Sequence, residues 1–144
     1  MPKATATCNS IINLMYRATA WANVADNAAS GPYTNVYVGL HTADLTAATG
    51  SQAENETAYT NYARQAAARS TGWDAASGGG TANAATISFP QCGVTGATLT
   101  HVSTGPVVSG ASAVWHYGAL NAALVVSSGI TPQFAGGALT VTES

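Results

Sequence analysis

Between Ala75 and Thr142 the chain contains no aspartate, glutamate, lysine or arginine, so 68 consecutive residues carry no formal charge apart from His101 and His116. About a quarter of the residues of an ordinary soluble domain are charged, whereas here the fraction is 7%. Charge keeps free monomers apart in solution. We therefore expect a chain that works while packed against copies of itself or against a partner.

Short apolar segments with alternating side chains recur through this uncharged stretch, separated by Gly, Pro, Ser and Asn. Six to eight short strands at a spacing of roughly 8–12 residues predict an all-β fold, an antiparallel β-sandwich that is jelly-roll-like, with one short N-terminal helix. The segments are TANAATISFP, ATLTHVS, AVWHYGAL, ALVVSS and ALTVT, with Ile87, Phe89, Leu139 and Val141 expected to face inward and Leu99 in the same direction as His101.

The N-terminal segment has the periodicity of a helix rather than of a strand. Its apolar residues recur at the spacing of one helix face. Asn9 or Ser10 is a candidate cap, and the breakers in Asp26–Ser30 predict the helix end. We expect an N-terminal arm and helix over residues 1–30, with an apolar stripe of Ile11, Leu14, Met15, Ala18 and Trp21 or Ala22.

Between the helix and the uncharged stretch the period changes to two. VYVGLHT, residues 36–42, predicts a strand. The polar, acidic segment 43–60 that follows predicts an exposed loop with little packed structure. The next segment fits a strand ending near Ala68 better than a short helix, because it lacks a wide apolar stripe. At this length we expect one domain spanning residues 1–144.

Composition excludes several classes of partner. The four basic residues form no patch, whereas duplex binding needs clustered Lys or Arg, so we expect no nucleic-acid partner. No apolar run approaches the roughly 18–20 residues of a membrane span, so we expect no membrane partner. The start lacks the pattern of a secretory signal, which predicts synthesis in a cytoplasm. Cys8 and Cys92 are then expected to be free thiols.

No enzymatic motif emerges from the sequence. His41 and Asp44 lie at the end of a strand, a fair place for catalysis or metal binding, but a turn aspartate and a rim histidine explain them equally well. His41, His101 and His116 would form a zinc site only if the fold brought them together. There is no Gly-x-Ser-x-Gly elbow. We expect no enzyme, with no catalytic, cofactor-binding or metal-binding residues.

Aromatic and basic residues are the better candidates for function, because Trp, Tyr and Arg are enriched at protein interfaces. Trp73 follows a glycine in a turn and is not easily buried there, whereas Trp115 is expected in the core. The arginines could instead be solvated guards of an edge strand. The candidate interface residues are Met15, Trp21, Tyr59, Tyr62, Arg64, Arg69 and Trp73.

The order of several segments resembles a family of small virion proteins of tailed bacteriophages, often described as tail fibre or head decoration proteins. After the helix of Ile11–Trp21 the resemblance rests on VYVGLHTAD, YARQA, NAATISFP, TLTHVS, HYGAL and FAGGALTVT, in that order over residues 9–142. The resemblance implies a virion structural protein without catalytic residues.

Together these observations predict a capsid decoration (cement) protein on the outer surface of the phage head, made in the host cytoplasm. Its expected partners are the major capsid protein and further copies of itself, as a dimer or trimer. Uncharged surfaces can be buried in an interface without desolvating charges. The alternative is a tail-fibre or neck component that binds a glycan on the host surface.

Overall fold

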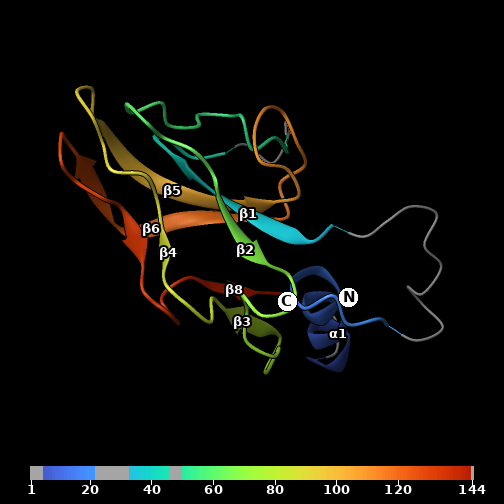
Figure 1. Ribbon diagram of the computed structural model, residues 1–144. Coiled ribbons are helices and arrows are strands. Elements are labelled where there is room, and N and C mark those ends of the chain that lie inside the picture. The colour runs from blue at the N-terminus through green and yellow to red at the C-terminus, as the bar shows by residue number, and fades with distance from the viewer. Residues whose placement is uncertain (1–4, 22–32, 46–49, 144) are drawn as a thin grey trace. The chain divides into compact units, whose positions relative to one another are not determined.

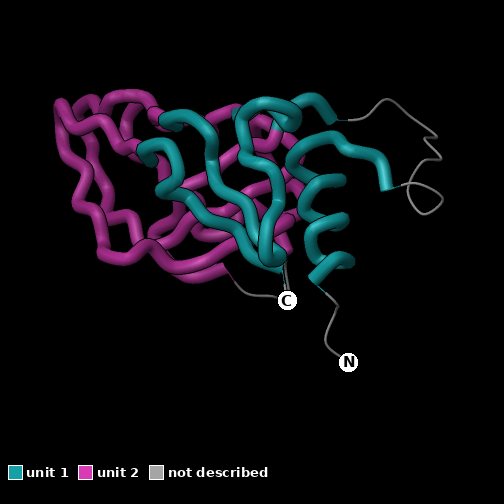
Figure 2. The backbone as a smooth tube through the Cα atoms, turned by 90° about the horizontal axis from the view of Figure 1, so that it is seen from below, with its two compact units in different colours: residues 1–35, 67–87, 134–144 teal, residues 36–66, 88–133 magenta. Residues whose placement is uncertain are grey.

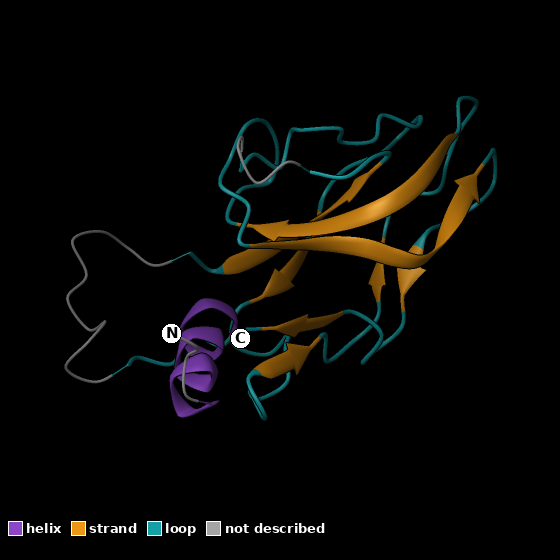
Figure 3. Ribbon diagram, turned by 180° about the vertical axis from the view of Figure 1, so that it is seen from behind, coloured by secondary structure: helices purple, strands orange, loops and turns teal. Residues whose placement is uncertain are grey.

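The computed structural model describes residues 5–21, 33–45 and 50–143, which form one helix and eight strands (Figures 1 and 3). The strand pairs with a defined register are antiparallel. The prediction of an all-β antiparallel fold with a short N-terminal helix is confirmed. The elements are α1 (Thr5–Tyr16), β1 (Asn35–His41), β2 (Gln65–Ala68), β3 (Gly80–Ala82), β4 (Ile87–Ser88), β5 (Ala97–Gly105), β6 (His116–Val126), β7 (Gln133–Phe134) and β8 (Thr140–Thr142).

The described chain divides into two compact units (Figure 2). Unit 1 comprises residues 1–35, 67–87 and 134–144, and unit 2 comprises residues 36–66 and 88–133. Each unit is therefore assembled from segments that are far apart in the sequence. The division does not test whether the units fold separately, so the single domain over 1–144 stays a prediction.

A four-stranded sheet with the order β2-β1-β5-β6 is the largest in the structure. The strand predicted at residues 36–42 is confirmed as β1, which lies inside this sheet. Alternate residues of a strand point to opposite faces, and Val38, Leu40 and His41 are all buried. Both faces of β1 are therefore covered, which places a histidine in the interior of unit 2.

Strand β6 pairs with β5 along its length and is the last strand of the sheet (Figure 1). The two strands predicted here, AVWHYGAL and ALVVSS, are one strand in the structure. Thr100 of β5 stands opposite Leu120–Ala123, between the register pairs His101↔Ala119 and Leu99↔Leu124. The extra residues are accommodated as an irregularity of the ladder instead of a turn.

Unit 1 contains the helix and the β3–β8 pair, in which Thr81 is opposite Val141. The stripe predicted for the helix is wrong, because the buried residues of α1 are Cys8, Ile12 and Tyr16. Tyr16 packs edge-on against Trp73, with ring centroids 4.4 Å apart. The predicted inward positions Leu139 and Val141, like Ile87, Phe89 and Leu99, are buried.

The ends of the helix also differ from expectation. Asn9 and Ser10 lie inside α1. The Asn9 side chain accepts a hydrogen bond from the Gly79 amide instead of capping the helix. The helix ends at Tyr16, well before the predicted region 26–30, because Ala18 adopts a positive φ of 53°. The amides of residues 17 and 19 both donate to the Asn13 carbonyl.

The prediction of an exposed loop at residues 43–60 is wrong for its second half. Gln52, Thr57 and Tyr59 are buried, and the Glu56 side chain is only 17% exposed. Backbone hydrogen bonds join Thr42 to Asn55 and Thr57 to Leu40. Gln52 and Glu56 have polar partners inside unit 2, whereas the Thr57 hydroxyl is buried without a hydrogen-bond partner among the described residues.

Candidate functional site

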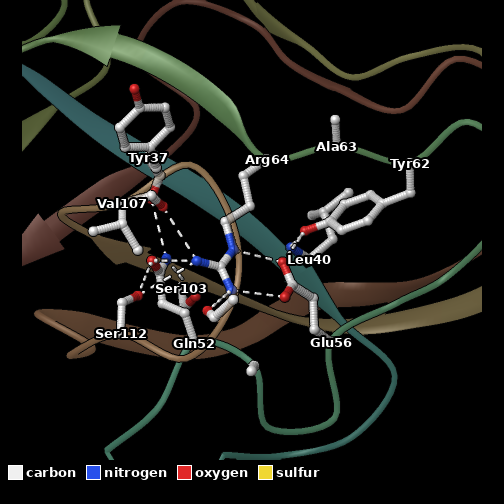
Figure 4. A network of polar contacts seen from close by, with 12 residues as sticks. Tyr37, Leu40, Gln52, Glu56, Tyr62, Ala63, Arg64, Ser103, Val107 and Ser112 are labelled. Atoms are coloured by element: carbon white, nitrogen blue, oxygen red, sulfur yellow. Dashed lines mark hydrogen bonds and ion pairs between the residues drawn. The ribbon is translucent and has the colours of Figure 1, made fainter.

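A buried arginine, Arg64, lies at the centre of a polar network in unit 2 (Figure 4). Its Nε donates to Glu56 Oε1 at 2.6 Å and a terminal nitrogen donates to Glu56 Oε2 at 2.7 Å. The same nitrogen donates to the Gly110 carbonyl, and the other terminal nitrogen donates to the Val107 carbonyl at 3.1 Å. This bidentate pair satisfies a charge that would be costly to bury alone. We call this network the Arg64 centre.

Gln52 extends the Arg64 centre toward β1 and β5. Its Oε1 accepts hydrogen bonds from Arg64 and from the Ser112 hydroxyl. Its Nε2 donates to the Tyr37 carbonyl at 3.1 Å and to Ser103 Oγ at 3.2 Å. The amide of Gln52 therefore uses both donors and its acceptor oxygen, as a fully buried side chain must.

His41 lies at the far end of this network. Its Nδ1 is 2.8 Å from the Glu54 carbonyl, which can only accept, so Nδ1 carries the proton. Its Nε2 is 2.8 Å from Ser103 Oγ and accepts the serine hydrogen. Burial is the largest cause that lowers the pKa of His41, against the opposing effects of the Glu54 hydrogen bond and Glu56. His41 is thus held neutral in the interior.

Tyr62 attaches the other side of the Arg64 centre to β1. Its hydroxyl accepts from the Leu40 amide at 3.0 Å and donates to Glu56 Oε1 at 2.8 Å. Burial is the largest cause that raises the pKa of Tyr62. The ring of Tyr62 lies edge-on to that of Tyr59, whose pKa burial raises to about 12. Both phenols therefore act as neutral hydrogen-bonding groups.

The Arg64 centre holds two loops in place. Gln52 and Glu56 belong to the segment after β1, and Val107, Gly110 and Ser112 belong to the connection between β5 and β6. The side chains of His41 and Ser103, which a hydrolase would need at its surface, are 0% and 1% exposed. The hydrogen bonds of the Arg64 centre hold these two loops in a fixed conformation.

The other histidines give no comparable cluster. His41 and His101 are register partners in β1 and β5, and His101 Nε2 is 3.5 Å from Asp44 Oδ1 at the surface. Within residues 5–21, 33–45 and 50–143 there is no group of three or more His, Cys, Asp or Glu side chains that could hold a metal ion. None of the helices described there is long and apolar enough to cross a membrane.

A second buried arginine, Arg69, lies in unit 1 and binds backbone carbonyls there. Its guanidinium donates to the carbonyls of Leu14, Met15 and Tyr33. Two of these carbonyls belong to the last turn of α1, where a cation interacts favourably with the helix dipole. Burial lowers the pKa of Arg69. The expectation of a solvated guard of an edge strand is wrong for Arg64 and Arg69, because both are buried among backbone acceptors.

The seven candidate interface residues fall into two groups. The expectation that Trp73 resists burial is wrong, since it is 1% exposed and packs on Tyr16. Met15, Trp21 and Tyr62 are partly exposed, and their role at an interface stays a prediction. Four side chains are buried within their own units and offer little surface to a neighbour: Tyr59, Arg64, Arg69 and Trp73.

The sequence analysis missed the partners of Arg64. Gln52 and Glu56 lie in the segment 43–60, which the sequence predicts as an exposed loop. Ser103, which bonds to Gln52 and not to Arg64, is predicted only as part of a strand. One available signal was the scarcity of charge: with so few ions in the chain, an arginine and a glutamate eight residues apart are natural partners. Trp115, expected in the core, is only partly buried.

The chain was compared with known proteins. A search of curated proteins found no match. A family model described as podophage GP4 fiber I protein gp80 matches residues 3–142. The match includes every helix and strand that the structure describes. The resemblance to tailed-phage virion proteins is thereby confirmed, and the chain belongs to the family of the podophage GP4 fiber I protein gp80.

Proposed function

We propose that this virion structural protein of a tailed phage is a subunit of a fibre of the phage particle. The observation that carries the proposal is the family match over residues 3–142, whose description names a fiber protein. A fibre is built from repeated copies, so we also propose that the chain forms a homo-oligomer, a dimer or a trimer.

The chemistry of the chain supports a structural role and not a catalytic one. The densest polar network, the Arg64 centre, is buried and holds loops together. Tyr59 and Trp73, two of the aromatic residues that a sugar could stack on, lie in the cores of their units. We therefore propose a fibre component whose main task is assembly, and no enzymatic activity.

Capsid decoration is the second candidate function. The observation that favours it is the stretch of 68 residues without formal charge. Such a surface can be buried against the major capsid protein without desolvating charges. Under this proposal the chain sits on the outer surface of the head and stabilises the shell by binding only its assembled form.

Copy number in the particle tests these proposals. Purified particles would be analysed by quantitative mass spectrometry, with the major capsid protein as the internal standard. A fibre subunit is expected in a small number of copies relative to the capsid protein, and its removal should leave the heads intact. A copy number close to that of the capsid protein would overturn the fibre and support decoration. Absence of the chain from the particles would overturn both proposals.

A further inference from the structure

Exposed apolar side chains are concentrated on unit 2. Among the described residues, six of the seven large hydrophobic side chains that are exposed lie in unit 2, and three of these, Tyr117, Leu124 and Val125, belong to β6. Val125 is 69% exposed. We define the β6 surface as the exposed residues of this strand: Tyr117, Ala119 and Asn121–Val125.

The β6 surface lacks the usual protection of a sheet edge. In the described part of the chain β6 bonds to β5 on one side and ends the sheet on the other. Natural edge strands are usually short or carry lysine, proline or inward charges. β6 is 11 residues long and contains neither a charged residue nor a proline. Its irregularity at Leu120–Ala123 is the one such device present.

We infer that the β6 surface is the contact through which copies of this chain associate, an inference that rests on the proposed function as a repeated subunit. A surface without charge is best covered by another surface without charge. A charged side chain placed against Leu124 and Val125 would lose its hydration and find no counter-ion, because residues 75–142 supply none. A second copy brings a surface that is free of charge in the same way. Most other protein surfaces do not, since about a quarter of residues are charged.

The size of the β6 surface fits this occupant. An extended strand rises about 3.4 Å per residue, so 11 residues span up to about 37 Å. This length is enough for a second copy of the strand to pair with it edge to edge. The sheet edge adds backbone donors and acceptors, which a second extended strand can satisfy.

The inference is tested on the isolated full-length chain by sedimentation equilibrium. The wild type is expected to self-associate, and Val125→Lys is expected to weaken that association at least tenfold. Val108→Lys is the matched control, because Val108 is also exposed and lies outside β6; it should associate like the wild type. Amide hydrogen exchange should show protection of residues 117–125 that increases with concentration in the wild type and in Val108→Lys, but not in Val125→Lys.

A wild type that stays monomeric at high concentration would overturn the inference, and so would an association that Val125→Lys leaves intact. Circular dichroism and a thermal melt of each variant separate a lost contact from a lost fold. A monomeric chain that is nevertheless present in purified particles would overturn this inference and the proposed homo-oligomer, while leaving the proposed role in a fibre of the particle standing. Absence from the particles would overturn the proposed function.

Discussion

Arg64 and Glu56 form a buried ion pair in which each group depends on the other. The Arg64 side chain is 1% exposed, and its partner carboxylate has three hydrogen-bonded contacts, two from Arg64 and one from Tyr62. Removing one member of such a pair leaves an uncompensated charge in the interior. A residue that sequence analysis placed at an interface therefore acts within its own unit.

We predict that Arg64→Met lowers the free energy of unfolding by roughly 3–5 kcal/mol, the usual cost of breaking a buried pair on one side. Adding Glu56→Gln to this variant should restore at least about 1 kcal/mol, because the orphaned charge is then gone. Urea denaturation gives the free energy of unfolding of the wild type, the single variant and the double variant. A loss below about 1 kcal/mol in the single variant would contradict the structural role of the Arg64 centre.

His41 predicts how stability depends on pH. Burial lowers its pKa from the ordinary 6.5, so the unfolded chain binds a proton at a higher pH than the folded chain. Stability is then complete above about pH 6.5 and falls as the pH drops through 6.5 toward the folded pKa. Protonation at Nε2 would also deprive the Ser103 hydroxyl of its acceptor.

Urea denaturation of the wild type between pH 8 and pH 5 should therefore show decreasing stability. The variant His41→Gln should have a flatter profile over the same range. Equal slopes for the wild type and His41→Gln would show that another group causes the dependence.

At the level of elements, β5 and β6 each contain a glycine, and the two glycines differ in their surroundings. A methyl group at Gly105 would lie 2.6 Å from the Ala113 carbonyl and also against the Gln52 side chain. A methyl group at Gly118 would meet nothing within 4 Å. Gly105 thus allows the loop before β6 and the Arg64 centre to approach β5 closely.

We predict that Gly105→Ala destabilises the chain by about 1–3 kcal/mol, as expected for forced overpacking against backbone. Gly118→Ala is the matched control and should change stability by no more than about 1 kcal/mol, in either direction. Thermal melts followed by circular dichroism compare the two. Equal effects of the two substitutions would mean that the loop before β6 is not held against Gly105.

The elements that sequence predicted well are those specified by local patterns. Alternation and turn residues predicted β1, β5 and β8, because side-chain period and turn chemistry are properties of neighbouring residues. The helix stripe failed, since Ile12 and Tyr16 are buried by packing against distant parts of unit 1 that no local pattern encodes. The prediction that Gln52 and Tyr59 lie in an exposed loop failed for the same reason, since both are buried.

Most of the Arg64 centre was out of reach of sequence reasoning, because several of its partners are backbone carbonyls or residues that are distant along the chain. Arg64 contacts the Val107 carbonyl 43 residues away, and Gln52 contacts Ser103 51 residues away. Every residue has a backbone carbonyl, so the sequence does not indicate which carbonyls accept hydrogen bonds from a side chain. Arginines in a chain with little charge are, in this structure, internal anchors of loops and of the helix end.

At the level of the whole molecule, the scarcity of charge and the family match point the same way. For a chain with 7% charged residues that belongs to a family of phage fiber proteins, we propose a role in contact with other subunits. Two of its few ionic groups, Arg64 and Arg69, are used inside the units together with their acceptors. We propose that these internal anchors stabilise the units and that the weakly charged exterior serves assembly.

The most direct test of this account is a cryo-EM reconstruction of the intact particle, with the chain fitted into the density. We expect repeated copies of the chain in a fibre, with the β6 surface covered by a neighbouring copy. Density in which every copy has the β6 surface open to solvent, or particles in which the chain cannot be found, would contradict it.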